Sequence, residues 1–272
     1  MKHKNRAFYL LAAVCIAALA LVAVSAQLFP NSESPVSGAM LEPPSARYLF
    51  GTDNLGRDLL ARSFNGLRLS LMLAVVVQIF SVALGILVGI ITGYFGGMID
   101  KVYVMLQNVL MSFPSLIASL CMIILLGTGL QTLVIALVVT NWITYARIIR
   151  GEIMMAKELD YVRGSKAIGT STPAILFRHI LPNIINPIIP LFTLMIGHTI
   201  LSISGLGFLG FGVQPPKAEM GLMMRDGLSY IGKAPWMFLL PGVLLVLYSL
   251  LINITGDKLQ DRLNPQNELY LM

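Results

Sequence analysis

Long apolar runs separated by short polar segments dominate the chain. A helix rises about 1.5 Å per residue, so crossing a ~30 Å hydrocarbon core takes about 20 apolar residues. Runs near or above that length cover residues 8–29, 69–95, 102–126, 131–149, 184–211 and 236–256. The pattern predicts an all-α, polytopic membrane protein with six transmembrane helices.

The composition agrees with a membrane protein. The 272 residues are 56% hydrophobic and 12% charged, and this charged share is about half that of an average soluble domain. Lys, Arg, Asp and Glu avoid the six runs when Arg147 is counted with the loop after the fourth run. Because a charge at the bilayer centre costs at least ~2.5 kcal/mol, this segregation fits a membrane protein. It excludes a cytosolic enzyme, a secreted disulfide scaffold and a disordered tail protein.

Lysine and arginine in the loops predict the orientation. With the N-terminus in the cytoplasm, the inner segments are 1–7, 96–101, 150–183 and 257–272. These segments and Arg147 hold twelve Lys and Arg, whereas the outer segments hold seven. The bias predicts cytoplasmic N- and C-termini, and it accounts for the net charge of +6 without nucleic-acid binding. An alternative for the first run is a cleaved signal peptide, since Ala23–Ala26 resembles a cleavage site.

The runs divide the chain into two parts. We expect residues 1–68 to form an N-terminal transmembrane helix plus an extracytoplasmic loop. Residues 69–272 form a core of five transmembrane helices, with the inner loop 150–183 and a cytoplasmic tail at 257–272.

The outer loop changes character along its length. Prolines within residues 30–50 exclude a regular helix there. We expect Thr52 or Asp53 to cap a short interfacial helix that leads into the second span.

Glycines and prolines mark special points in the spans. Gly85, Gly89 and Gly93 recur at four-residue spacing, which places them on one helix face where another backbone can approach closely. Pro114 is expected to kink the third span. The stretch 205–210 matches the letters G-x-G-x-x-G, but it follows no strand of a βαβ unit. We interpret it as a helix break or a tight packing point near the outer surface.

Motifs of enzymatic chemistry are missing from the sequence. It contains no Walker A pattern, no H-E-x-x-H and no G-x-S-x-G. The spans also lack the acidic or basic residues that proton- or sodium-coupled carriers use. The chain is therefore predicted to have no ATPase site or other enzymatic site, and energy for uphill transport would come from elsewhere.

The inner loop 150–183 is charged and amphipathic. Residues 152–168 can form a helix that Gly169 terminates. Thr170, Ser171 or Thr172 then caps a second short helix, with Pro173 in its first turn, and Pro182 is expected to end it. A helix–turn–helix of this kind suits docking into a groove on another protein.

The same loop resembles the coupling-helix loop of ABC importer permeases, whose pattern is E-A-A-x3-G-x9-I-x-L-P. Gly169, Leu181 and Pro182 match at the right spacing, whereas Arg163-Gly164-Ser165 replace E-A-A and His179 replaces Ile. The rest of the chain is similar to the C-type permease of the dipeptide, oligopeptide and nickel branch. The segments that carry this similarity are 51–58, 178–183, 207–216 and 256–265.

The resemblance implies a type I ABC importer permease in a bacterial plasma membrane. Its expected partners are a second homologous permease, two ATP-binding subunits that bind ATP and Mg, an extracytoplasmic substrate-binding protein and membrane lipid. No cofactor is expected in this subunit. The residues expected to couple to the ATPases are Arg163, Gly164, Ser165, Gly169, Leu181 and Pro182.

The substrate is predicted less directly. We expect His198, Met195 and Asn141 to line the path, with His198 as a transient metal ligand; the alternative is a neutral His198 bonded to Thr193 or Thr199. The stretch 196–201 looks more like nickel permeases, which favours nickel or a metal chelate. Di- or oligopeptide import by the same machinery is the alternative. A self-sufficient channel or secondary carrier is a remote one.

Overall fold

The structure is a computed structural model that describes residues 39–263. The first predicted span, 8–29, and the end of the predicted tail lie outside these residues. Within them the chain is helical, and the one β-bridge pairs Thr52 with Asp58. The elements in order are α2 Leu59–Ile90, the π-helix η1 Ile91–Phe95, α3 Gly97–Met111, α4 Ser115–Leu126, α5 Leu130–Ala156, α6 Asp160–Ala167, α7 Thr172–Ala174, the π-helix η2 Ile175–Ile180, α8 Leu181–Phe208, α9 Met220–Leu228 and α10 Trp236–Leu263.

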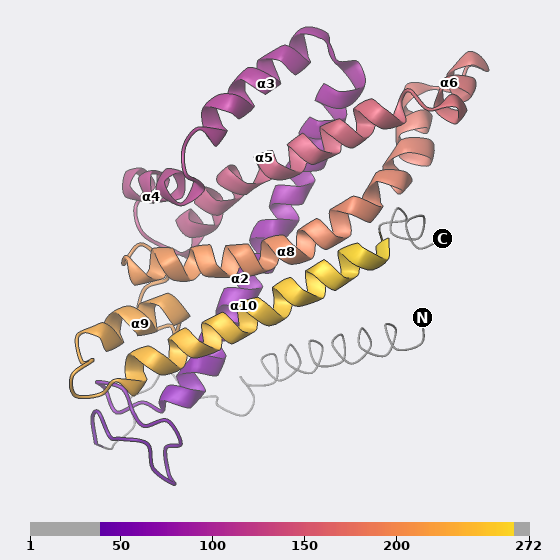
Figure 1. Cartoon of the computed structure of the whole chain (residues 1–272). Coiled ribbons are helices and arrows are strands. Elements are labelled where there is room, and N and C mark those ends of the chain that lie inside the picture. The colour runs from indigo at the N-terminus through magenta and orange to yellow at the C-terminus, as the bar shows by residue number, and fades with distance from the viewer. Residues whose placement is uncertain (1–38, 264–272) are drawn as a thin grey trace, which may run out of the picture.

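Four long helical segments form the body of the protein (Figure 1). The segments long and apolar enough to cross a membrane are Leu59–Phe95, Leu130–Ala156, Thr172–Phe208 and Trp236–Asp261. In Figure 1, α6 lies at one end of this body and α9 lies at the other. We call these the α6 end and the α9 end.

The third predicted span, 102–126, is not one straight helix. It is a pair, α3 and α4, bent by 88° at Ser112–Pro114. Pro114 has no N–H and disfavours a helical conformation at the residue before it, so the break falls where the proline predicts it. The pair counts as a fifth span if the two helices cross together.

The long helices extend beyond the predicted apolar runs. Because 37 residues span about 55 Å as a helix, Leu59–Phe95 and Thr172–Phe208 exceed the ~30 Å hydrocarbon core. Charges such as Arg62 and Arg150 therefore lie inside helices rather than in loops, which the apolar pattern did not predict. The expected short helix near Thr52 is absent from the described residues. Instead, the Asp58 carboxylate accepts from the N–H groups of Leu60 and Ala61 and starts α2 directly.

The three glycines of α2 and η1 pack directly against α5. A Cβ at Gly85 would overlap the Tyr145 side chain. A Cβ at Gly89 would lie 2.7 Å from the Ile149 side chain, and one at Gly93 would lie 2.9 Å from the Arg150 carbonyl oxygen. Glycine at these positions lets two helices approach more closely than any side chain would permit.

Candidate functional site

Helix α6 projects from the end of α5 as a separate short helix. The predicted helix 152–168 is interrupted at 157–159, where Leu159 is extended. This turn redirects the chain so that Val162 is buried in a cluster with Ile175 and Ile180 of η2. The prediction of one continuous helix was wrong because burial of Val162 requires the chain to change direction.

The predicted turn glycine lies where α6 ends. Gly169 has φ +84°, a left-handed conformation that favours glycine. The Gly169 N–H donates to the Lys166 carbonyl (3.1 Å) and the Thr170 N–H donates to the Ser165 carbonyl (3.0 Å). This double closure is a Schellman-type helix end, and it fixes the direction in which the chain leaves α6.

The outer side of α6 is exposed. Arg163 forms an ion pair with Glu158, and the hydrogen bond from Arg163 lowers the pKa of this carboxyl group. Gly164 is exposed, and the half-buried Ser165 donates to the Tyr161 carbonyl (2.8 Å). Ile168 is 84% exposed at the tip. The three residues at the E-A-A positions therefore share one exposed helix.

Pro182 does not end a helix, which corrects the prediction. Thr172–Phe208 is one continuous helical segment, and Leu181 and Pro182 lie in the first turn of α8, directly after η2. A π-helical turn interrupts the regular backbone ladder, and this irregularity accommodates a proline that has no N–H. Leu181 is half-buried and Pro182 is exposed.

Two polar contacts fasten the base of α6 to the η1–α3 turn. Arg150 of α5 forms a two-bond ion pair with Asp100 of α3. Seven residues later, Lys157 donates to the Gly93 carbonyl of η1 (3.3 Å). Residues seven apart lie on one side of a helix, so both contacts join the end of α5 to the same turn.

A buried polar network joins α2, α5 and α8 in the middle of the bundle. Gln78 donates to Thr199 and accepts from the Tyr145 hydroxyl (2.6 Å), and Asn141 donates to Thr199 (3.3 Å). All four side chains are buried. Hydrogen bonds of this kind hold transmembrane helices together, so Asn141 lies in the core rather than on an open path.

The three predicted path residues are not brought together. Met195 is half-buried and offers its carbonyl to Gln78 (3.3 Å), whereas His198 is exposed on α8. Thr199 belongs to the buried network, and the Thr193 hydroxyl donates to the Ile189 carbonyl (3.2 Å). Neither threonine is bonded to His198.

The α9 end contains a fully buried carboxylate that the sequence pattern did not single out. Glu219 accepts from the N–H groups of Gly221 (3.0 Å) and Leu222 (2.9 Å) and from the hydroxyls of Ser204 (2.9 Å) and Ser70 (3.5 Å). Burial raises its pKa, and these hydrogen bonds oppose the increase. The carboxylate caps α9 and connects it to α8 and α2.

Glycines make room for this carboxylate. A Cβ at Gly207 would overlap Oε2 of Glu219, and a Cβ at Gly221 would overlap the Ser204 carbonyl oxygen. The G-x-G-x-x-G letters therefore mark tight packing of α8 against α9. Glu is not among the preferred N-cap residues, so the sequence carries no strong signal for this cap.

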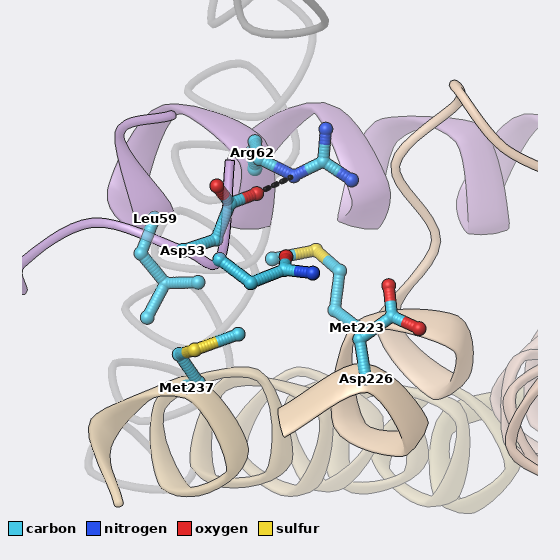
Figure 2. A pocket seen from close by; sticks show the side chains of 7 residues that line it. Asp53, Leu59, Arg62, Met223, Asp226 and Met237 are labelled. Atoms are coloured by element: carbon cyan, nitrogen blue, oxygen red, sulfur yellow. Dashed lines mark ion pairs between the residues drawn. The ribbon is translucent and has the colours of Figure 1, made fainter. Parts of the chain in front are cut away.

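The α9 end also contains a cluster of charged side chains (Figure 2). Asp53 forms ion pairs with Arg57 (2.7 Å) and Arg62 (3.3 Å), and all three are buried. Asp226 of α9 lines a small pocket beside Asp53 and Arg62, and partial burial raises its pKa. The ion pair of Asp53 with Arg62 joins the loop before α2 to the start of α2.

Known proteins with similar sequences show which family this chain resembles. Residues 85–268 match the family described as "Binding-protein-dependent transport system inner membrane component". The chain is 31% identical over 268 residues to the oligopeptide transport system permease protein OppC of Bacillus subtilis (strain 168), covering 98% of this chain and 88% of that protein. It is 39% identical over 225 residues to the dipeptide transport system permease protein DppC of the same strain, covering 82% and 70%.

Solved structures show the same fold. An inward-facing structure of the MetNI methionine ABC transporter aligns with a TM-score of 0.56 at 21% identity, covering 73% of this chain and 94% of that one. An amino acid ABC transporter with histidines aligns with a TM-score of 0.58 at 16% identity, covering 75% and 94%. The chain therefore belongs to the family of binding-protein-dependent transport system inner membrane components, and it is a permease of the ABC importer type.

Proposed function

We propose that this chain imports di- or oligopeptides as one permease of an ABC importer. The observation that carries the proposal is the similarity to peptide permeases, at 31% and 39% identity over most of the chain. This favours peptides over the nickel or metal-chelate substrate that the sequence suggested. No group of three or more His, Cys, Asp or Glu among residues 39–263 is arranged to hold a metal ion.

In this proposal the chain pairs with a second permease to enclose the path. Two ATPase subunits bind ATP and Mg, and a substrate-binding protein delivers the peptide at the α9 end. The α6 end then faces the cytoplasm, in agreement with the bias of Lys and Arg. The exposed α6, with Arg163 to Ser165 and the Gly169 turn, docks on an ATPase subunit, and ATP-driven movement of that subunit displaces α6.

Uptake by a reconstituted complex tests the substrate. Proteoliposomes that contain this chain, its permease partner, both ATPases and the binding protein are supplied with tri-alanine or with nickel. We expect ATP-dependent accumulation of tri-alanine, and His198→Ala should leave it within about twofold of the parent because a peptide needs no imidazole metal ligand. Accumulation of nickel without peptide, or transport by this chain alone, would overturn the proposal.

A further inference from the structure

Polar side chains follow one side of α8 near the α6 end. Asn183 and Asn186 are exposed and Thr193 is half-buried, whereas the stripe that includes Ile184 and Ile188 packs into the core. Spacings of three and seven residues place the polar groups on the same side of the helix. Polar groups within a span face water or protein rather than lipid.

Two prolines remove backbone donors at the same place. In a regular α-helix, residue 187 would donate to the Asn183 carbonyl and residue 190 to the Asn186 carbonyl, but both residues are proline. Pro187 and Asn183 are exposed, so the Asn183 carbonyl loses its regular donor on the open side of α8, whereas Pro190 is buried. Within a membrane such backbone is tolerated where it is buried in protein or lines a water-filled cavity.

The side chains add further acceptors. The Asn183 amide nitrogen donates to the Tyr161 hydroxyl (3.0 Å) and to the His179 carbonyl (2.8 Å), so its donor is occupied. Within residues 39–263, the side-chain oxygen of Asn183 and the whole amide of Asn186 form no hydrogen bond. This side of α8 therefore offers two unbonded side-chain amide oxygens three residues apart, those of Asn183 and Asn186.

We propose that this side of α8, defined by Asn183, Asn186 and Thr193, binds backbone N–H groups of the transported peptide. The inference rests on the proposed function, and it adds where and by which atoms the peptide is held. Acceptors of this kind complement the N–H donors that every peptide presents whatever its side chains. The ten residues from 183 to 193 rise about 15 Å, which is the length of four or five extended residues.

The site is connected directly to α6. Tyr161, in the first turn of α6, accepts the hydrogen bond from Asn183. A displacement of α6 breaks or moves this bond and frees the amide nitrogen of Asn183. The movement of α6 that accompanies ATP hydrolysis would thus add a free N–H donor, that of Asn183, to a site that otherwise offers acceptors.

N-methylated peptides test this site, because methylation removes the N–H group and keeps the rest of the backbone. The full complex in proteoliposomes is supplied with tri-alanine or its analogue methylated at both peptide bonds, each at saturating loaded binding protein. We expect Asn186→Leu to lower the maximal uptake of tri-alanine roughly two- to tenfold, the range for one lost hydrogen bond. Uptake of the methylated analogue should not change.

The matched control is Ile185→Leu, which introduces the same residue at the neighbouring exposed position and should affect neither peptide. An equal fall for both peptides with Asn186→Leu, or no change for either, would overturn the site, because it would show that Asn186 packs against the partner permease or lipid. If the parent complex transports neither peptide, the proposed function itself has failed.

Thiol modification gives an independent measurement. In a chain with Cys15 and Cys121 replaced by Ser, Asn186→Cys should react with a water-soluble thiol reagent, and turnover with tri-alanine should slow this reaction. Ile185→Cys should not be protected by tri-alanine. Absence of reaction at position 186, or equal rates with and without tri-alanine, would contradict a peptide-binding surface.

Discussion

The helices at the two ends of the protein, α9 and α6, are attached to the rest of the chain in opposite ways. At the α9 end, a carboxylate with no exposed surface connects α9 to α8 and α2 through four hydrogen bonds, and Gly207 and Gly221 allow the close approach. At the α6 end, the ion pair of Arg163 with Glu158 is exposed and Ile168 projects outward. Elements that move are drawn from regions with exposed contacts and little buried surface. The comparison predicts that α6 moves more readily than α9.

The largest effect is expected from removing the buried carboxylate. Glu219→Leu has a similar volume but leaves the N–H groups of Gly221 and Leu222 without an acceptor in a site closed to water. We expect a loss of stability of roughly 2–4 kcal/mol, seen as a lower thermal unfolding midpoint in detergent.

Glu158→Leu is the control for this substitution at the other end. Its carboxylate and the Arg163 partner are both exposed, so solvent screens the ion pair and its loss should change the unfolding midpoint little. Equal unfolding midpoints for the two variants would show that the two ends do not differ in this way.

A smaller effect is expected from adding one methyl group at each end. Gly221→Ala forces a Cβ into the Ser204 carbonyl, and overpacking of this kind costs about 1–3 kcal/mol. Gly164→Ala on α6 meets nothing within 4 Å, and alanine gains up to about 1 kcal/mol of helix propensity. Thermal unfolding of the two variants measures both changes, and a loss at Gly164 that matches the loss at Gly221 would contradict the comparison.

The smallest effect on stability is expected at the ion pair of Asp100 in α3 with Arg150 near the end of α5. The Asp100 and Arg150 side chains are about one-fifth exposed, so their bidentate pair keeps part of its strength. A double-mutant cycle with Asp100→Ala and Arg150→Ala should give a coupling energy on the order of 1 kcal/mol. A coupling energy indistinguishable from zero would mean that α3 is not fastened to the end of α5.

Features set by local chain chemistry could be predicted from the sequence. The break at Pro114 and the turn at Gly169 each depend on one residue type and its immediate neighbours. The close approach at Gly85 is made to Tyr145 of another helix, but the glycine spacing alone was enough to predict a close approach there. The apolar runs also located the four long helical segments, although they underestimated their length.

Features set by tertiary contacts could not be predicted. Glu219 reads as a loop charge because its four donors come from residues as distant as Ser70. Asn141 reads as a path residue because polarity alone does not distinguish an open face from the buried network with Thr199. Pro182 reads as a helix end because the π-helical turn that accommodates it has no sequence signature.

The most direct test concerns the turn that directs α6. Gly169→Val introduces a β-branched residue at φ +84°, which costs roughly 1–2 kcal/mol locally and redirects the chain at the tip. In the reconstituted complex, tri-alanine uptake and ATP hydrolysis are measured together for this variant and the parent. Coupling through α6 predicts that hydrolysis continues while uptake falls at least tenfold. Uptake and hydrolysis that both match the parent would contradict it.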